Sequence, residues 1–261
     1  MTATPHTADA ASGLWAATTG VADAPHVVLV HGSLDRSAGM LKLSRRLDEE
    51  FRVSRYDRRG YGRSIDVGGP FTMACQVGDL VEVIGAAPAP CVVVGHSYGG
   101  DVALATAERH PDLVAGVVVY EAPLSWMAWW PGSTAGADAR DWADDPPAAA
   151  ERFMRRLIGD DKWERLPPAT RVARRAEGPA LVGELADLRE HPPWDPAAIR
   201  VPVLPVYGAR SLDHHRRSAQ VLADLFGAPA VAIDGAKHFG VTTHPDEVGA
   251  LVAGFAHRVL R

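Results

Sequence analysis

Cysteine is scarce in this sequence, and neither sign of charge dominates it. The 261 residues include two cysteines, Cys75 and Cys91, too few and too far apart for a metal-binding knuckle or a redox pair. We interpret both as buried thiols of a reducing compartment. Lys and Arg number 27 against 32 Asp and Glu, a net charge of −5. A mildly acidic chain without blocks of like charge lacks the positive surface that binds nucleic acid.

Long hydrophobic runs are also missing. The first 20 residues have neither a basic segment nor a continuous apolar stretch. No run approaches the roughly 18 apolar residues that span a membrane. We therefore expect a cytoplasmic protein with no membrane and no nucleic acid among its partners. A chain of this length buries enough surface to fold as one domain without a metal or a disulfide.

Short apolar runs alternate with helical patterns along the chain. The expected strands span residues 14–19, 26–30, 51–56, 91–94, 114–120, 201–207 and 230–233, and the expected helices 36–50, 72–84, 98–108, 214–226 and 245–260. Several strands are apolar throughout, which is typical of parallel strands with helices on both faces. The sequence therefore predicts an α/β fold with a mostly parallel central sheet flanked by helices.

One long segment interrupts this alternation. About 75 residues separate the strand that ends at Tyr120 from the next, more than a simple crossover needs. Within it, Phe153 with Leu157 and Leu181 with Leu185 have helical spacing, so at least two amphipathic helices are expected. The Ala, Gly, Asp and Pro of residues 134–150 indicate a mobile connector. We expect a core domain of residues 1–123 and 196–261, with residues 124–195 inserted as a helical cap or lid.

The strongest chemical motif lies in residues 91–100. A buried strand leads into Gly95-His96-Ser97-Tyr98-Gly99 and then into a helix rich in Ala and Leu. A tight turn of this kind exposes the serine hydroxyl, and the following helix N-terminus faces the negative charge that develops during attack. The two glycines remove side chains that would clash in the turn. Ser97 is therefore a candidate nucleophile, and the alternative is a glycine-rich turn with an incidental serine.

With two further motifs, the chain resembles the α/β-hydrolase fold family over nearly its whole length. Residues 28–33, which end in His31-Gly32-Ser33, resemble the family's oxyanion loop, and residues 56–64 resemble its D-x-R-G-x-G-x-S segment. The resemblance implies an α/β-hydrolase fold with a helical cap inserted after strand 6 of the family's arrangement. It also implies an oxyanion hole formed by the backbone N–H groups of Ser33 and Tyr98, and no cofactor. We interpret residues 57–64 as structural support.

His238 is the candidate general base among eleven histidines. It follows the last expected strand, where the resembled family has its catalytic histidine, and the alternative is a histidine of a surface loop. His96 is expected to pack, and His244 to cap a helix or face solvent. His214 and His215 are adjacent on a helix, so they are not expected to face one another or to form a metal site. No metal is expected.

The triad acid departs from the family's usual pattern. The family most often has an aspartate in a short turn after its seventh strand, where this sequence has Ser211. Glu121, after the sixth, is similar in position to the acid of haloalkane dehalogenases and zearalenone-type lactonases. We favour Glu121, because a buried carboxylate needs a partner such as histidine. Asp213 is the alternative acid. A structural carboxylate and a helix N-cap are the plainer interpretations of Glu121 and Asp213 respectively.

Aromatic residues concentrate in the inserted segment. Six of the seven tryptophans lie there, and they favour a bulky, apolar, ring-containing substrate, although any one of them could instead dock the cap. The expected pocket residues are Gly32, Leu34, Trp126, Met127, Trp129, Trp130, Phe153, Trp163 and Phe239. Residues 151–177 carry 8 Lys and Arg against 5 Asp and Glu. We interpret this small excess as a solvated face rather than as a binding site for an anionic substrate.

These features predict a serine hydrolase. Its small-molecule substrate would be an ester or lactone with a bulky apolar group, cleaved through a Ser-His-acid triad and an acyl-enzyme. An alternative is other cofactor-free chemistry at the same site, such as C–C hydrolysis, perhydrolysis, or a thioesterase or cyclase reaction of secondary metabolism. A non-catalytic ligand-binding module is the remaining alternative. The sequence leaves open whether the chain forms a homodimer.

Overall fold

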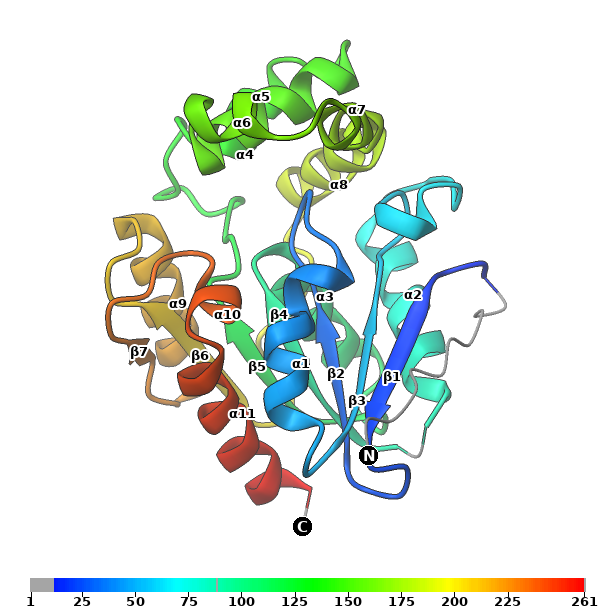
Figure 1. Ribbon diagram of the computed structural model, residues 1–261. Coiled ribbons are helices and arrows are strands. Elements are labelled where there is room, and N and C mark those ends of the chain that lie inside the picture. The colour runs from blue at the N-terminus through cyan, green and yellow to red at the C-terminus, as the bar shows by residue number, and fades with distance from the viewer. Residues whose placement is uncertain (1–11, 88, 261) are drawn as a thin grey trace.

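The computed structural model describes residues 12–87 and 89–260, and within them the strands form one sheet (Figure 1). The strands are β1 Ala16–Gly20, β2 His26–Val30, β3 Arg52–Tyr56, β4 Cys91–His96, β5 Val114–Tyr120, β6 Val203–Gly208 and β7 Val231–Ile233. Their order across the sheet is β1-β3-β2-β4-β5-β6-β7. β1 pairs antiparallel with β3, and the other pairs are parallel. The predicted fold class is confirmed.

Both faces of the sheet are apolar, which explains the continuous apolar runs. Along β2, Val28 and Val30 pack into one core cluster, whereas Val27 and Leu29 pack into another on the opposite face. Successive side chains of a strand point to opposite faces, so a strand covered on both sides must be apolar throughout.

Helices cover both faces of the sheet (Figure 1). The elements outside the inserted segment are η1 Ser37–Met40, α1 Leu41–Leu47, η2 Gly62–Ser64, α2 Met73–Gly85, α3 Tyr98–Arg109, α9 Asp213–Phe226, α10 Gly240–Thr243 and α11 Pro245–Val259. Buried residues of α2, α3 and α9 pack on one face, and those of α1 and α11 pack on the other. Among the helices of the described residues, none is both long enough and apolar enough to cross a membrane.

The inserted segment, residues 124–195, follows β5 and lies above the carboxyl ends of the parallel strands (Figure 1). Strand β5 thus corresponds to the strand that the resembled family numbers as its sixth, after which the insertion was expected. The helices of the segment are α4 Ala135–Arg140, α5 Pro146–Ile158, α6 Asp160–Arg165, α7 Pro168–Ala176 and α8 Gly178–Glu190.

The composition of residues 134–150 indicated a mobile connector, but much of this stretch is helical. It forms α4 and the first turn of α5, and residues 141–145 connect the two. Thr134 and Asp145 cap the two helices, because their side chains accept hydrogen bonds from the backbone N–H groups of Ala137 and Ala148. Alanine has the highest helix propensity, and capped ends stabilise short helices. For these reasons a stretch whose composition suggests a linker contains the starts of two helices here.

Helix α8 anchors the inserted segment to the core through buried carboxylates. Glu184 forms an ion pair of 2.8 Å with Arg58, and both side chains are 0% exposed. The Tyr61 hydroxyl donates a 2.7 Å hydrogen bond to the same carboxylate. The backbone N–H of Met73 donates to Asp187 at 2.6 Å. These contacts hold the segment over the edge of the sheet at which loops of a parallel α/β fold carry ligand sites.

Candidate active site

Ser97 occupies a strained turn between β4 and α3. Its φ of 53° and ψ of −129° lie outside the regions that ordinary residues favour. A Cβ on Gly95 would lie 2.3 Å from the carbonyl oxygen of Gly99, and one on Gly99 would lie 2.4 Å from that of Val30. Only glycine fits at either position. The close-packed backbone around Gly95 and Gly99 thus holds Ser97 in this turn at the end of β4, as the motif predicted.

The loop that carries His238 is fastened to the core from two sides. The Tyr120 hydroxyl donates a 2.8 Å hydrogen bond to the carbonyl oxygen of Lys237. The His96 Nε2 donates a 2.8 Å hydrogen bond to the carbonyl oxygen of His238. Burial, and then the nearby His238, lower the pKa of His96 to about 3, so this ring is neutral at pH 7. His96 does pack, as expected, and it also fixes the backbone of His238.

Glu121, directly after β5, contacts His238 through a short hydrogen bond. The two atoms, His238 Nδ1 and Glu121 Oε2, are 2.7 Å apart, and Glu121 is 1% exposed. Since a carboxylate only accepts, Nδ1 carries the proton and Nε2 is left with a free lone pair. The second oxygen, Oε1, accepts hydrogen bonds from the Gly208 N–H at 2.7 Å and from the Ser211 hydroxyl. A φ of 54° at Glu121 turns the backbone at this point.

Asp213 lies away from this cluster. Its side chain is 93% exposed and forms an ion pair with Arg216 on the same helix. It is the first residue of α9, whose N-cap position is Leu212, so the interpretation of Asp213 as the N-cap is wrong. Ser211, in the family's usual position for the acid, instead donates a hydrogen bond to Glu121.

The segment expected to supply one oxyanion amide runs directly against the nucleophile. A Cβ on Gly32 would lie 2.8 Å from the Cβ of Ser97, so the backbones approach closely there. The following residue, Ser33, lines the cavity beside Ser97. Tyr98 is the first residue of α3, and the first N–H groups of a helix have no acceptor within it. Ser33 is therefore near Ser97, which Tyr98 follows directly in the chain, and the two residues remain the candidates for the oxyanion amides.

A buried network of hydrogen bonds holds residues 31–33, the segment expected to supply an oxyanion amide, in position. His31 Nδ1 donates a 2.8 Å hydrogen bond to the Gly32 carbonyl, and its Nε2 accepts one of 2.9 Å from the Arg58 N–H. The Arg58 guanidinium also donates to the carbonyl oxygens of His31 and Gly32 at 3.0 and 3.2 Å. Residues 57–64 thus act as structural support, and their arginine links the segment to Glu184 of α8.

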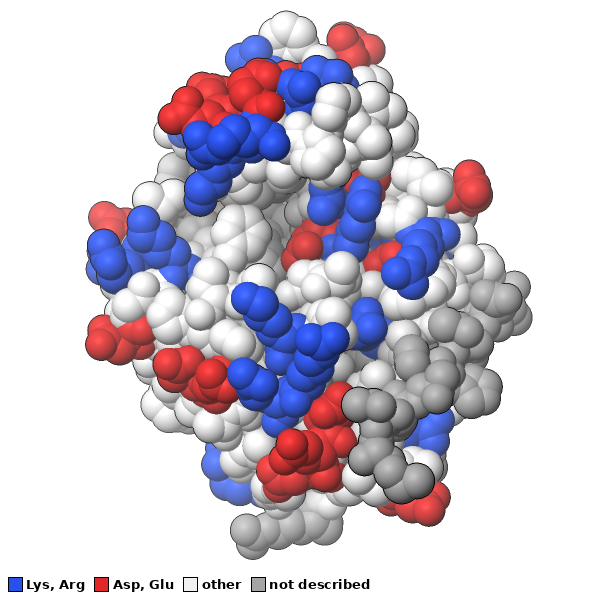
Figure 2. Space-filling view, in the orientation of Figure 1, with Lys and Arg blue, Asp and Glu red and all other residues white. Residues whose placement is uncertain are grey.

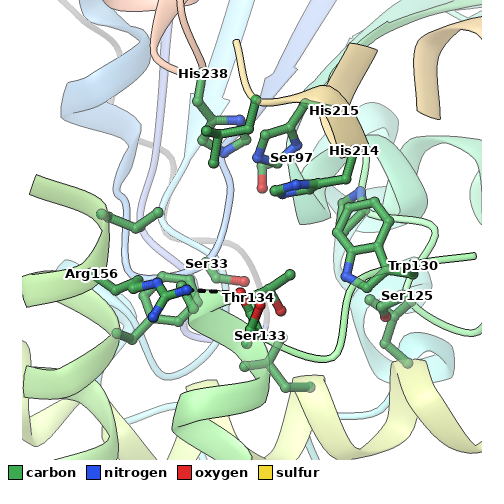
Figure 3. Close-up of a pocket in the computed structure, with 18 of the residues that line it drawn as sticks. Ser33, Ser97, Ser125, Trp130, Ser133, Thr134, Arg156, His214, His215 and His238 are labelled. Atoms are coloured by element: carbon green, nitrogen blue, oxygen red, sulfur yellow. Dashed lines mark hydrogen bonds between the residues drawn. The ribbon is translucent and has the colours of Figure 1, made fainter. Parts of the chain in front are cut away.

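A cavity of about 150 Å³ opens beside Ser97, between the core and the inserted segment. Figure 2 shows the corresponding hollow below the inserted segment at the top of the view. Ser97, His238 and Ser33 all line the cavity, and of the expected pocket residues Trp130 and Phe153 do as well. Figure 3 shows Ser97 and His238 together at one side of this space. The structure therefore brings the predicted nucleophile and base to one cavity.

The other expected tryptophans of the pocket do not line this cavity. Trp163 is 0% exposed inside the inserted segment, where its Nε1 donates a 3.1 Å hydrogen bond to Glu151. Trp126 packs edge-on against Trp194. Trp129 contacts Met127 through a 3.2 Å hydrogen bond from its Nε1 to the Met127 sulfur. These side chains fill the interior of the segment or dock it on the core, because large aromatic rings bury the most apolar surface when they are enclosed.

Three further expected pocket residues border the site without lining the cavity. Leu34 is buried in a cluster with Tyr61 and residues of α5 and α8. Gly32 lies under Ser97. The ring of Phe239 packs edge-on against that of His238, with 5.5 Å between the centroids.

The structure contradicts the sequence interpretation of His214 and His215. Their rings lie 4.2 Å apart, and both line the cavity (Figure 3). His215 stacks on His238, with 4.3 Å between ring centroids and 21° between planes. Burial lowers the pKa of both, that of His215 well below 6.5. Neighbouring residues of a helix face different directions, but the first turn of α9 lies so close to the loop of His238 that both rings reach the cavity.

Glu121, His215 and His238 each offer a metal-binding atom, and these atoms all lie within 4.8 Å of one another. A tetrahedral metal at about 2.0–2.1 Å from its ligands would keep those atoms about 3.3 Å apart. Glu121 Oε2 and His238 Nδ1 are 2.7 Å apart, which is a hydrogen-bond distance. This pair is therefore arranged as a hydrogen-bonded couple rather than as metal ligands.

Comparison with known proteins agrees with this geometry. The model of the alpha/beta hydrolase family matches residues 27–251. A pimeloyl-(acyl-carrier protein) methyl ester esterase of Yersinia enterocolitica is 27% identical over 250 residues, which cover 89% of this chain and 93% of that protein.

Solved structures show the same fold. The enol-lactonase of Burkholderia xenovorans aligns with a TM-score of 0.74 at 25% identity, over 96% of this chain and 99% of that chain. A thermophilic esterase of Thermogutta terrifontis aligns with a TM-score of 0.75 at 22% identity, over 98% of both chains. With the family match over residues 27–251, these likenesses establish that the chain belongs to the alpha/beta hydrolase family and is a hydrolase of that fold.

Proposed function

We propose that this protein cleaves a carboxylic ester or lactone through a Ser97-His238-Glu121 triad. The observation that carries the proposal is the 2.7 Å hydrogen bond from His238 Nδ1 to Glu121, in a histidine that lines the same cavity as Ser97. Relatives include an esterase and an enol-lactonase, which supports ester or lactone chemistry here. The inserted segment serves as the cap of this site.

In the proposed mechanism, His238 Nε2 removes the proton of Ser97 as its oxygen attacks the substrate carbonyl. Glu121 holds the ring in the tautomer that leaves Nε2 free, and stabilises the imidazolium that forms. The Ser33 and Tyr98 amides bind the oxyanion of the tetrahedral intermediate. The imidazolium then gives its proton to the departing alcohol, and a water molecule, deprotonated by His238, releases the acyl group. Every step uses groups of this chain and water.

The lining of the cavity bears on the substrate. Trp130, Phe153 and Leu157 supply apolar surface to this cavity of about 150 Å³. We therefore keep the apolar character of the expected substrate.

A matched pair of substitutions tests the triad. Glu121→Gln should lower kcat for a 4-nitrophenyl ester by about 10⁴-fold, because the amide no longer stabilises the imidazolium or the correct tautomer. Asp213→Asn is the control and should change kcat little, because its side chain is 93% exposed and lies outside the cluster. The opposite result would make Asp213 the acid.

A labelling experiment tests the nucleophile and the class of reaction. A serine-reactive phosphonate should label the wild type and fail to label Ser97→Ala that is equally folded by circular dichroism. A turnover screen over aryl esters, lactones, thioesters and diketones should then find esters or lactones to be the best substrates. No labelling of the folded wild type, or turnover of diketones alone, would contradict the proposal.

A further inference from the structure

Two arginines line the cavity, and both come from the inserted segment. Arg156 lies on α5 and Arg189 on α8. Figure 3 shows Arg156 with Ser133 across the cavity from Ser97 and His238. Among the described residues, no Asp or Glu lines the cavity. The described lining therefore carries two arginines and no carboxylate, in a chain whose net charge is −5, although Arg156 also forms an ion pair with Asp138 beside the cavity.

Arg189 has no direct ion-pair partner. Within the described part of the chain, its guanidinium takes part in neither an ion pair nor a hydrogen bond with another residue. It is half-buried, and burial, followed by the charge of Arg140, lowers its pKa, while the charge of Asp141 opposes this shift only in part. Partial removal of a cation from water without a partner costs free energy. An anion bound in the cavity would recover that cost.

Two hydrogen bonds hold the Arg156 guanidinium in place and leave some of its N–H donors unused. Its Nη2 donates a 2.8 Å hydrogen bond to the Ser133 carbonyl, and its Nη1 donates one of 3.2 Å to Asp138. A guanidinium has five N–H donors in a fixed plane, so further donors remain available to a ligand. Planar guanidinium groups match the two oxygens of a carboxylate.

Apolar side chains line the same cavity. Phe153, Leu157, Leu185 and Leu188 are among them, and they suit a short hydrocarbon linker. Burial lowers the pKa of His214 and of His215, so these two rings do not add a cationic site of their own. The cavity thus combines the candidate nucleophile, apolar side chains and two arginines.

We propose that the substrate is an ester or lactone that also carries a carboxylate, which Arg156 and Arg189 bind while Ser97 attacks the carbonyl at the other end of a short apolar linker. This inference rests on the proposed function and adds the charge of the substrate. It also changes our interpretation of the excess of basic residues in 151–177: one of them, Arg156, faces the cavity.

The wild type alone provides the first test. Its kcat/KM for the mono-4-nitrophenyl ester of hexanedioic acid is compared with that for the same ester whose far carboxylate is methylated. The charged ester should react at least about tenfold faster in kcat/KM, since a hydrogen bond to a charged group is stronger than one to a neutral group. Equal values, or a preference for the methylated ester, would overturn the inference and leave the proposed function standing.

Substitutions then locate the site. Arg156→Met and Arg189→Met should each lower the ratio of the two kcat/KM values toward one, chiefly through KM of the charged ester. Arg152→Met is the matched control: it lies one turn earlier on α5, its guanidinium stacks on Trp142 at 4.4 Å, and it does not line the cavity. It should keep the wild-type ratio. An unchanged ratio in folded Arg156→Met and Arg189→Met would exclude these residues.

A third measurement separates the two hypotheses. If neither ester is cleaved, the proposed function fails. The anion site is then tested by protection of Ser97 from a serine-reactive phosphonate. Hexanedioate should slow the labelling and 1,6-hexanediol should not, because the two differ in charge and share the same apolar linker. Equal protection by both, or by neither, would refute the anion site.

Discussion

Ser211 stands where the resembled family usually has its triad acid, and Glu121 is the acid that we propose instead. The Ser211 hydroxyl donates a hydrogen bond to Glu121, whose other oxygen faces His238. We therefore expect a carboxylate at position 211 to reach the space of a truncated Glu121. Glu121→Ala with Ser211→Asp should recover at least about tenfold in kcat/KM over Glu121→Ala, from a starting loss of about 10⁴-fold.

The single variant Ser211→Asp is the control for this exchange. It would bring a second carboxylate against Glu121, and two like charges at that distance oppose each other's ionisation. It should therefore be less active than the wild type. A double variant that folds but is no more active than Glu121→Ala would show that position 211 cannot orient His238.

Helix α8 connects the inserted segment to residues 31–33, which are expected to supply an oxyanion amide. Glu184 is paired with Arg58, which in turn holds the carbonyl oxygens of His31 and Gly32. Glu184→Gln would leave the buried Arg58 charge without compensation. The free energy of unfolding should fall by about 3–5 kcal/mol, measured by urea denaturation.

An exposed ion pair offers the comparison for this helix. Asp246 and Arg46 pair across α11 and α1, with side chains 70% and 49% exposed. Asp246→Asn should lower the free energy of unfolding by no more than about 1 kcal/mol. Equal losses in Glu184→Gln and Asp246→Asn would mean that the buried pair does not anchor the segment.

Buried neutral histidines make the stability of the whole molecule depend on pH. Burial, and then Arg52, lower the pKa of His26 to about 4, and burial lowers that of His96 to about 3. Unfolded histidines titrate near 6.5, so between that pH and about 4 the unfolded state binds protons that the folded state does not. The contribution of these histidines to the free energy of unfolding is therefore fully present above pH 6.5. It should fall by about 1.4 kcal/mol per pH unit for each such histidine as the pH is lowered.

Urea denaturation at several pH values between 7 and 5 measures this slope. His26→Gln should reduce the slope by about one proton, because glutamine can still bond Ser54 but cannot titrate. An identical slope in wild type and His26→Gln would show that His26 takes no part in the acid sensitivity.

The positions of the strands along the chain and the turn at Ser97 could be predicted from the sequence, because they depend on local patterns. His238 was predicted from its place after the last expected strand, where the resembled family has its catalytic histidine. A buried strand, two glycines and a helix define the turn at Ser97 wherever they occur together. Continuous apolar runs likewise identify strands that are covered on both faces. The starts of α4 and α5 were missed, since a composition of Ala, Gly, Asp and Pro suits both a linker and capped helix ends.

Only the tertiary structure shows which side chains lie beside Ser97 and His238. Glu121 and His238 are 117 residues apart, and Arg156 and Arg189 come from different helices to one cavity. Sequence spacing says nothing of where side chains from separate elements meet. The sequence favoured Glu121 and kept Asp213 as the alternative, and the packing of β5, β6 and α9 buried Glu121 against His238 and left Asp213 in solvent. The packing of the inserted segment likewise buried Trp163 and Trp194 and brought two arginines to the cavity that Ser97 lines.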